Sequence, residues 1–284
     1  MWHWLADPLQ YGFMQTALMA ALILGVTSGL TSTFTVVRGM AFFADALAHA
    51  VLPGVALAFV WWGASGASLF WGALAAALLA SWAVYGIARE SRVREETAIG
   101  IVMAAALALG VAIISTQRTY AVDLSHVLFG DILGVGPEDL VRTAVLGAAT
   151  LAVTVALWRP FSIVSFDPVL GATIGLRVGA LQCGLLALIA VTTVLALQTV
   201  GVTMSLAILV IPGATARLLT SRLTPMALAS VAIGIGASVV GLYASYYLSI
   251  PSGPAIVLAH TAIFAAARAA TSLRPGGVRA AAGP

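Results

Sequence analysis

The chain has few charged residues: Asp, Glu, Lys and Arg make up 8% of its 284 residues, whereas soluble domains carry about 25%. Hydrophobic residues make up 61%. A chain with so little charge cannot cover a surface that faces water, so the composition predicts an integral membrane protein. No basic segment with a small-residue cleavage site opens the sequence, and we expect the first apolar stretch to stay in the protein as a span.

Lysine is absent, and all 13 basic residues are arginines. A Walker phosphate-binding loop needs a lysine, so we expect no ATP hydrolysis by this chain and do not expect it to be an enzyme. The single cysteine, Cys183, excludes internal disulfides and a cysteine-based zinc site. The small net charge of +3 provides no basic patch for nucleic acid.

Apolar runs of spanning length recur along the whole chain. A transmembrane helix needs about 20 apolar residues, and a helix satisfies its own backbone groups in lipid. The runs are continuous and do not alternate with polar residues, which excludes a β-barrel. We predict an all-α bundle of about eight or nine transmembrane helices, in a single domain over 1–284. The runs fall at about 13–36, 40–62, 66–88, 97–116, 140–158, 179–199, 203–220, 225–248 and 254–270.

The arginines predict an orientation. With the N-terminus outside and an odd number of spans, only Arg118 and Arg142 lie outside, and the other eleven face the cytoplasm. Cytoplasmic loops carry the excess of positive charge in membrane proteins. We therefore expect the N-terminus outside and the C-terminus in the cytoplasm.

Two ionisable side chains, Asp45 and His49, lie within the second apolar run. A spacing of four places them on one helix face, with Cβ atoms about 5–6 Å apart. Because a charge at such depth costs about 2.5–3.5 kcal/mol, we expect a functional role. Carboxylate and imidazole donors suit Zn²⁺, Mn²⁺ or Fe²⁺, and a two-fold axis beside this helix would bring four of them together. The alternative is a buried Asp–His hydrogen bond that only holds helices together.

Proline interrupts the same run four residues after the histidine. Pro53 has no N–H to donate to the carbonyl of His49. We expect the helix to kink there and to leave that oxygen free.

Two connections are too long to be simple turns. In the outer one, the segment VDLSHVLFGDILGV predicts a short helix at about 123–134. In the inner one, Asp167 can cap a helix over about 167–179, with Pro168 in its first turn. Gly171 and Gly175 on that helix would let another surface approach closely, although an ordinary amphipathic loop helix is the simpler alternative. We expect the tail, 275–284, to be disordered.

Several segments together resemble the permease subunit of bacterial metal-importing ABC transporters, the family that carries zinc, manganese or iron(II). They occur in the family's order, from about residue 20 to 260. The matching stretches are VVRGMAFFADALAHAVLPGVALAF, HVLFGDILGV, SFDPVLGATIGLRVG, ALQTVGVTMSLAILVIPGATARLL and SIPSGPAIVL.

The resemblance implies a fold like that of the vitamin B12 and metal importers, in the bacterial cytoplasmic membrane. The implied partners are two cytoplasmic ATP-binding subunits, an extracytoplasmic metal-binding protein and a second permease copy. The metal is then substrate, with no tightly bound cofactor. The roles implied are metal transit for Asp45 and His49, and ATPase coupling for Asp167, Pro168, Gly171 and Gly175.

The outer segment, by the same resemblance, would lie near an external gate that includes His126 and Asp131. A solvated polar face is the simpler interpretation of these two residues, and His126 stands where relatives usually carry an aromatic residue. We expect His260, on the last span, to form a hydrogen bond between helices.

Two other classes of protein compete with the permease. A proton-driven secondary transporter would use the same intramembrane carboxylate as a proton relay and would need no ATPase. An intramembrane metallopeptidase needs a His-Glu-x-x-His helix or an equivalent, which this sequence does not contain.

Overall fold

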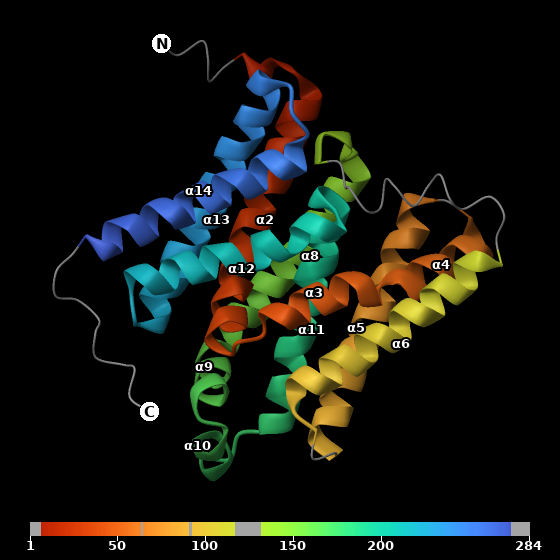
Figure 1. The fold of residues 1–284 in the computed structure, drawn as a ribbon, viewed down its shortest axis with the longest axis vertical. Coiled ribbons are helices and arrows are strands. Elements are labelled where there is room, and N and C mark those ends of the chain that lie inside the picture. Colours follow the sequence, from red (N-terminus) through yellow and green to blue (C-terminus); the bar gives the residue numbers. More distant parts are fainter. Residues whose placement is uncertain (1–6, 64, 91–92, 117–131, 274–284) are drawn as a thin grey trace.

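The computed structural model describes residues 7–63, 65–90, 93–116 and 132–273, and these residues form helices with no strand among them (Figure 1). The all-α prediction is therefore confirmed. The elements are η1 (Pro8–Gln10), α2 (Gly12–Val37), α3 (Ala41–Ala50), α4 (Leu52–Trp62), α5 (Gly66–Glu90), α6 (Glu95–Ser115), η2 (Ile132–Gly134), α8 (Pro137–Ala156), α9 (Trp158–Phe166), α10 (Pro168–Thr173), α11 (Val178–Val200), α12 (Val202–Leu219), α13 (Leu223–Leu248) and α14 (Ser252–Ser272).

Within the described residues, eight segments are long and apolar enough to cross a membrane, with α3 and α4 counted together as one. The remaining predicted run, 203–220, forms α12, whose apolar part is shorter and which contains Pro212. Both findings agree with the predicted eight or nine crossings.

The connections gather at two ends of the bundle. At one end, Gly66 at the start of α5, Asp139 in α8 and Gln198 in α11 line one cavity of about 230 Å³. At the other end, Arg38 after α2 faces Glu95 at the start of α6, with 3.7 Å between guanidinium and carboxylate. Helices that cross one layer in succession must have their connections at its two sides in this way.

Small residues bring α2 against α13 in the interior. A Cβ built on Gly25 would lie 2.8 Å from the backbone nitrogen of Ile235, closer than real atoms pack. Nearby, the hydroxyl of Ser230 donates a hydrogen bond to the carbonyl of Gly29 at 2.6 Å. Small residues and interhelical hydroxyl bonds hold helices together where lipid removes the hydrophobic contrast. Direct backbone contact thus joins α2 to α13.

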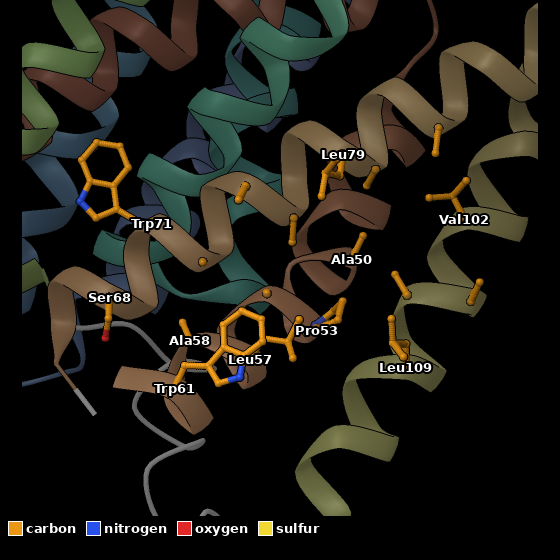
Figure 2. Close-up of a pocket in the computed structure, with 18 of the residues that line it drawn as sticks. Ala50, Pro53, Leu57, Ala58, Trp61, Ser68, Trp71, Leu79, Val102 and Leu109 are labelled. Carbon is orange, nitrogen blue, oxygen red and sulfur yellow. The ribbon is translucent and has the colours of Figure 1, made fainter. Parts of the chain in front are cut away.

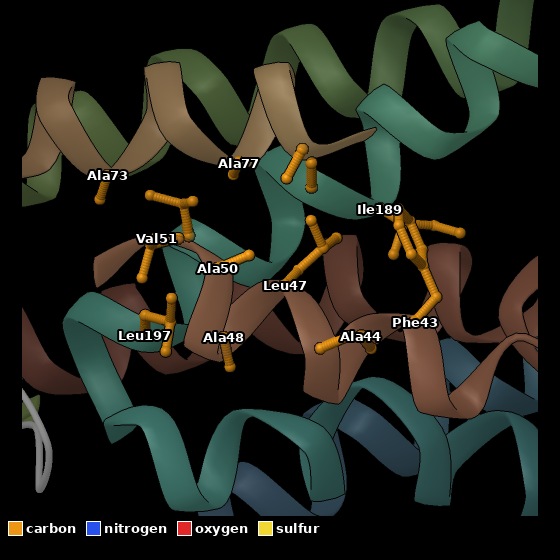
Figure 3. Packing of buried hydrophobic residues seen from close by; sticks show 14 of the residues in the cluster. Phe43, Ala44, Leu47, Ala48, Ala50, Val51, Ala73, Ala77, Ile189 and Leu197 are labelled. Atoms are coloured by element: carbon orange, nitrogen blue, oxygen red, sulfur yellow. The ribbon is translucent and has the colours of Figure 1, made fainter. Parts of the chain in front are cut away.

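The buried residues of α3 pack against four helices, α5, α6, α11 and α12. Figure 3 shows Leu47 and Val51 near Ala73 and Ala77 of α5, with Ile189 on α11 beside Phe43. Because these contacts bury six of the ten residues of α3, they fix which way its remaining residues point.

Candidate metal-binding site

Helix α3 has one face that the chain leaves open. Six of its ten residues are buried: Phe43, Ala44, Ala46, Leu47, Ala48 and Ala50. The other four are Ala41, Phe42, Asp45 and His49, and Phe42 is 47% exposed. The helical spacing of four thus places Asp45 and His49, both half-buried, together on this open face, as predicted from the sequence.

Neither side chain of this pair is held by the described residues. Asp45 and His49 form no hydrogen bond or ion pair with any residue in the described part. The alternative of a structural hydrogen bond between the two is therefore not supported. No group of three or more His, Cys, Asp and Glu side chains that could hold a metal occurs among the described residues. A complete coordination sphere needs donors from elsewhere.

The chain bends directly after His49. Helix α3 ends at Ala50, and α4 begins at Leu52 with Pro53 in its first turn, so the predicted break occurs at Val51. The carbonyl of His49 is not left free, however, and that prediction is wrong. The N–H of Val51 bonds to the carbonyl of Leu47 at 3.2 Å and also turns toward the carbonyl of His49.

A polar cluster that the sequence analysis did not assign to a site lies beside this bend. The side-chain amide of Gln198 donates to a carboxylate oxygen of Asp139 at 2.7 Å, and Arg142 approaches the same oxygen at 3.0 Å. Asp139 and Gln198 line the 230 Å³ cavity together with Val51 of the bend. The one signal in the sequence was a glutamine within an apolar run. The cluster joins α8 to α11 next to the helix that carries the pair.

A buried guanidinium lies near the other end of α3. The Arg38 side chain is 11% exposed, and its Nη1 has no hydrogen-bond partner. Burial lowers the pKa of Arg38, and the carboxylate of Glu95 opposes that shift. Arg38 and Glu95 line a cavity of about 220 Å³ with Met40 and Phe43 at the start of α3. A route past Asp45 toward this end would therefore meet a fixed positive charge.

The inner helix begins as predicted and ends early. A carboxylate oxygen of Asp167 accepts a hydrogen bond from the N–H of Leu170 at 2.9 Å, and Pro168 opens α10. The helix stops at Thr173 and does not continue to 179, because Gly175 has a φ of +83°.

Gly171 on this helix faces the interior. A Cβ there would meet Val164 at 3.3 Å and Val178 at 3.4 Å, so the close approach it permits is to its own chain and not to another surface. Large apolar side chains are exposed here: Val169 is 72% exposed, and Ile174, directly after the helix, is 54% exposed. Helix α10 therefore presents an apolar surface. Because the helix lies in a connection between spans, contact with lipid does not account for that surface.

The remaining candidates have different outcomes. His126 and Asp131 lie outside the described residues, and of the segment 123–134 only η2 is described, as a 3-10 turn. His260 is fully buried, but its Nδ1–H donates to the carbonyl of Ile256 on its own helix at 2.9 Å. The prediction that His260 forms a hydrogen bond between helices is therefore wrong, as far as the described residues show.

Comparison with known proteins identifies similar chains over nearly the full length. The model of the ABC 3 transport family matches residues 10–271. The chain is 40% identical to the "Manganese transport system membrane protein MntC" of Halalkalibacterium halodurans, over 91% of this chain and 87% of the relative. It is 36% identical to the "Probable iron transport system membrane protein" of Haemophilus influenzae, over 96% of this chain and 99% of the relative. Among solved structures, PsaBC from Streptococcus pneumoniae in complex with Fab matches with a TM-score of 0.80 at 35% identity, covering 93% of this chain and 94% of that one.

Proposed function

The chain belongs to the ABC 3 transport family, and from this we propose that it is the permease subunit of an ATP-binding-cassette importer for a divalent transition metal. The relatives named for manganese and iron favour Mn²⁺ or Fe²⁺ as substrate. Zn²⁺ fits the same oxygen and nitrogen donors. The eight apolar spans support a multi-pass protein, which we place in the bacterial cytoplasmic membrane with the N-terminus outside and the C-terminus in the cytoplasm.

The observation that carries this proposal is the open face of α3. It holds a carboxylate and an imidazole that have no partner within the described chain. Two ionisable groups left facing hydrocarbon would be costly. A second copy related by a two-fold axis along this face would cover them and would supply two Asp45 carboxylates and two His49 imidazoles. Four such donors are a first coordination sphere for a transition metal.

Transport in this proposal alternates the access to that site. Two cytoplasmic ATP-binding subunits dock on the exposed apolar surface of α10, and an extracytoplasmic binding protein delivers the metal at the opposite end. ATP-driven movement of α10 passes to α11 through the turn at Gly175, and α11 packs against α3. The bend at Val51 then lets α3 and α4 move relative to each other. The permease itself positions the metal and breaks no covalent bond.

Uptake of radioactive ⁵⁴Mn²⁺ into cells that depend on this importer tests the proposal. We expect Asp45→Asn and His49→Gln to abolish saturable uptake, because each change alters two donors in a symmetric pair. The matched control is Phe42→Leu, on the same open face but without a metal-donating atom. Membrane levels of all three variants are measured by immunoblot. Normal uptake by both donor variants would refute the site.

The same assay separates the permease from a secondary transporter. Deletion of the ATP-binding subunit should stop uptake even when a proton gradient is present. Continued uptake driven by the proton gradient alone would overturn the assignment to an ATP-driven importer.

A further inference from the structure

A second feature of the molecule, independent of the proposed metal transport, is a large groove between α4, α5 and α6. It encloses about 900 Å³, and neither Asp45 nor His49 lines it. Figure 2 shows Pro53 and Leu57 of α4 on one side of this space and Val102 and Leu109 of α6 on the other. We call it the α4–α6 groove.

The groove exists because α4 and α5 touch along their backbones while small side chains face it from α5 and α6. A Cβ on Gly54 would collide with the carbonyl oxygen of Gly72, and a Cβ on Gly72 would collide with that of Gly54. The backbones of α4 and α5 are therefore in direct contact and form a floor. Alanines line the sides, including Ala75 and Ala76 of α5 and Ala105 and Ala106 of α6. Side chains this small leave the space between α5 and α6 unfilled.

The groove is about as long as the hydrocarbon core of a bilayer is thick. Its lining on α5 runs from Ser68 to Ile87, which is about 28 Å along a helix that rises 1.5 Å per residue. The hydrocarbon core of a bilayer is about 30 Å thick. Apart from the tryptophan N–H groups, Ser68 provides the one polar side chain in the lining. Water would find few hydrogen-bond partners there. If the space were empty, the side chains that line it would lose dispersion contacts.

One end of the groove carries aromatic side chains of the kind found at membrane surfaces. Trp61, Trp62 and Trp71 line it near the joint between α4 and α5, and they are 66%, 68% and 53% exposed. Tryptophan concentrates at the level of lipid headgroups, where its ring is in apolar surroundings and its N–H meets water. An occupant of the groove would therefore have a polar end at this level and an apolar body below it.

From these features we propose that the α4–α6 groove binds an acyl chain of a membrane phospholipid, with the headgroup beside Trp61 and Trp62. Neither Asp45 nor His49 lines the groove, so a second copy that covers those two side chains does not have to fill it. The bound acyl chain touches Ala50 and Pro53, on either side of the bend at Val51. It is thus placed to support the segment that follows His49.

Photo-crosslinking with a defined lipid tests this proposal. The full-length chain is placed in nanodiscs of phosphatidylglycerol and phosphatidylethanolamine that contain a phosphatidylethanolamine with a diazirine in one acyl chain. After irradiation, mass spectrometry of peptides locates the attached lipid. We expect label concentrated on groove residues such as Leu57, Leu79 and Leu109.

Two variants of one helix provide the matched comparison. Ala105→Phe places a ring inside the groove, whereas Ala104→Phe adds the same ring to an exposed α6 position outside it. We expect Ala105→Phe to reduce labelling of α4 and α5 roughly tenfold, the effect of about two lost methylene contacts, and Ala104→Phe to leave it unchanged. Circular dichroism spectra of both variants that match the parent chain show that the fold is retained.

Two results would overturn the proposal. Label spread evenly over all exposed faces, and unaffected by Ala105→Phe, would mean that only bulk lipid passes the groove. A disulfide-linked dimer formed through Leu109→Cys in a Cys183→Ser background would mean that a second copy occupies it instead.

Discussion

The turn that ends α10 offers a graded test of how this helix works. Gly175 has a φ of +83°, and a Cβ there would meet no atom within 4 Å. Any effect of a substitution therefore comes from backbone strain and not from a clash. The left-handed region costs an ordinary residue roughly 1–2 kcal/mol, whereas asparagine enters it more readily and a β-branched residue is a true outlier.

We expect Gly175→Val to displace α10 from its position, Gly175→Ala to do so less, and Gly175→Asn least. A strain of about 1–2 kcal/mol changes the ratio of correctly placed to displaced helix by roughly 5–30-fold. The assay is the number of ATP molecules hydrolysed per metal ion transported, in proteoliposomes that contain the permease, the ATP-binding subunits and the binding protein. The ratio should rise in the order Asn, Ala, Val.

A second glycine provides the control for this series. Gly63, between α4 and α5 at the opposite end of the bundle, has a φ of +76° and equally open surroundings. Gly63→Val strains the backbone at least as much but away from α10, because a φ of +76° with a ψ of −171° is essentially restricted to glycine. It should leave the ratio near that of the parent chain. If Gly175→Val and Gly175→Asn behave alike, or if Gly63→Val uncouples as strongly, then the turn does not transmit movement from α10.

Three further changes test the packing and the cap. Gly25→Ala should lower the thermal unfolding midpoint in detergent, since overpacking of this kind typically costs about 1–3 kcal/mol. The control Gly236→Ala should leave the midpoint unchanged, because a Cβ at Gly236 would meet nothing within 4 Å. Equal midpoints for the two variants would contradict the close contact at Gly25. Gln198→Leu should also lower the midpoint, because it removes the hydrogen bond to the Asp139 carboxylate. Such a bond to a charged group is worth about 1.5–3 kcal/mol when buried, and less here because Asp139 is partly exposed. An unchanged midpoint would mean that the cluster does not join α8 to α11. Asp167→Ala should weaken ATPase coupling by removing a cap worth about 0.5–2 kcal/mol, and Asp167→Ser should restore it; failure of serine to rescue would exclude capping as the reason.

Features decided by neighbouring residues could be predicted from the sequence. The spacing of Asp45 and His49, the break before Pro53 and the cap at Asp167 each depend on residues within four positions. Helical geometry and the missing N–H of proline leave little choice at such places. The number of crossings followed from run length in the same way.

Features decided by distant contacts could not be predicted. Gln198 and Asp139 lie 59 residues apart, and only the packing of α8 on α11 brings them together. The inward position of Gly171 depends on Val178 beyond the next turn. His260 was expected to reach another helix, but the carbonyl of Ile256, four residues before it, is the closer acceptor.

The most direct test of the account is a cryo-EM structure of the assembled importer trapped with Mn²⁺. The account predicts two permease copies with the open faces of α3 turned toward each other, and metal density within coordination distance of the Asp45 carboxylate and the His49 imidazole from both. Density for the ion at another place, with these side chains facing lipid, would contradict it.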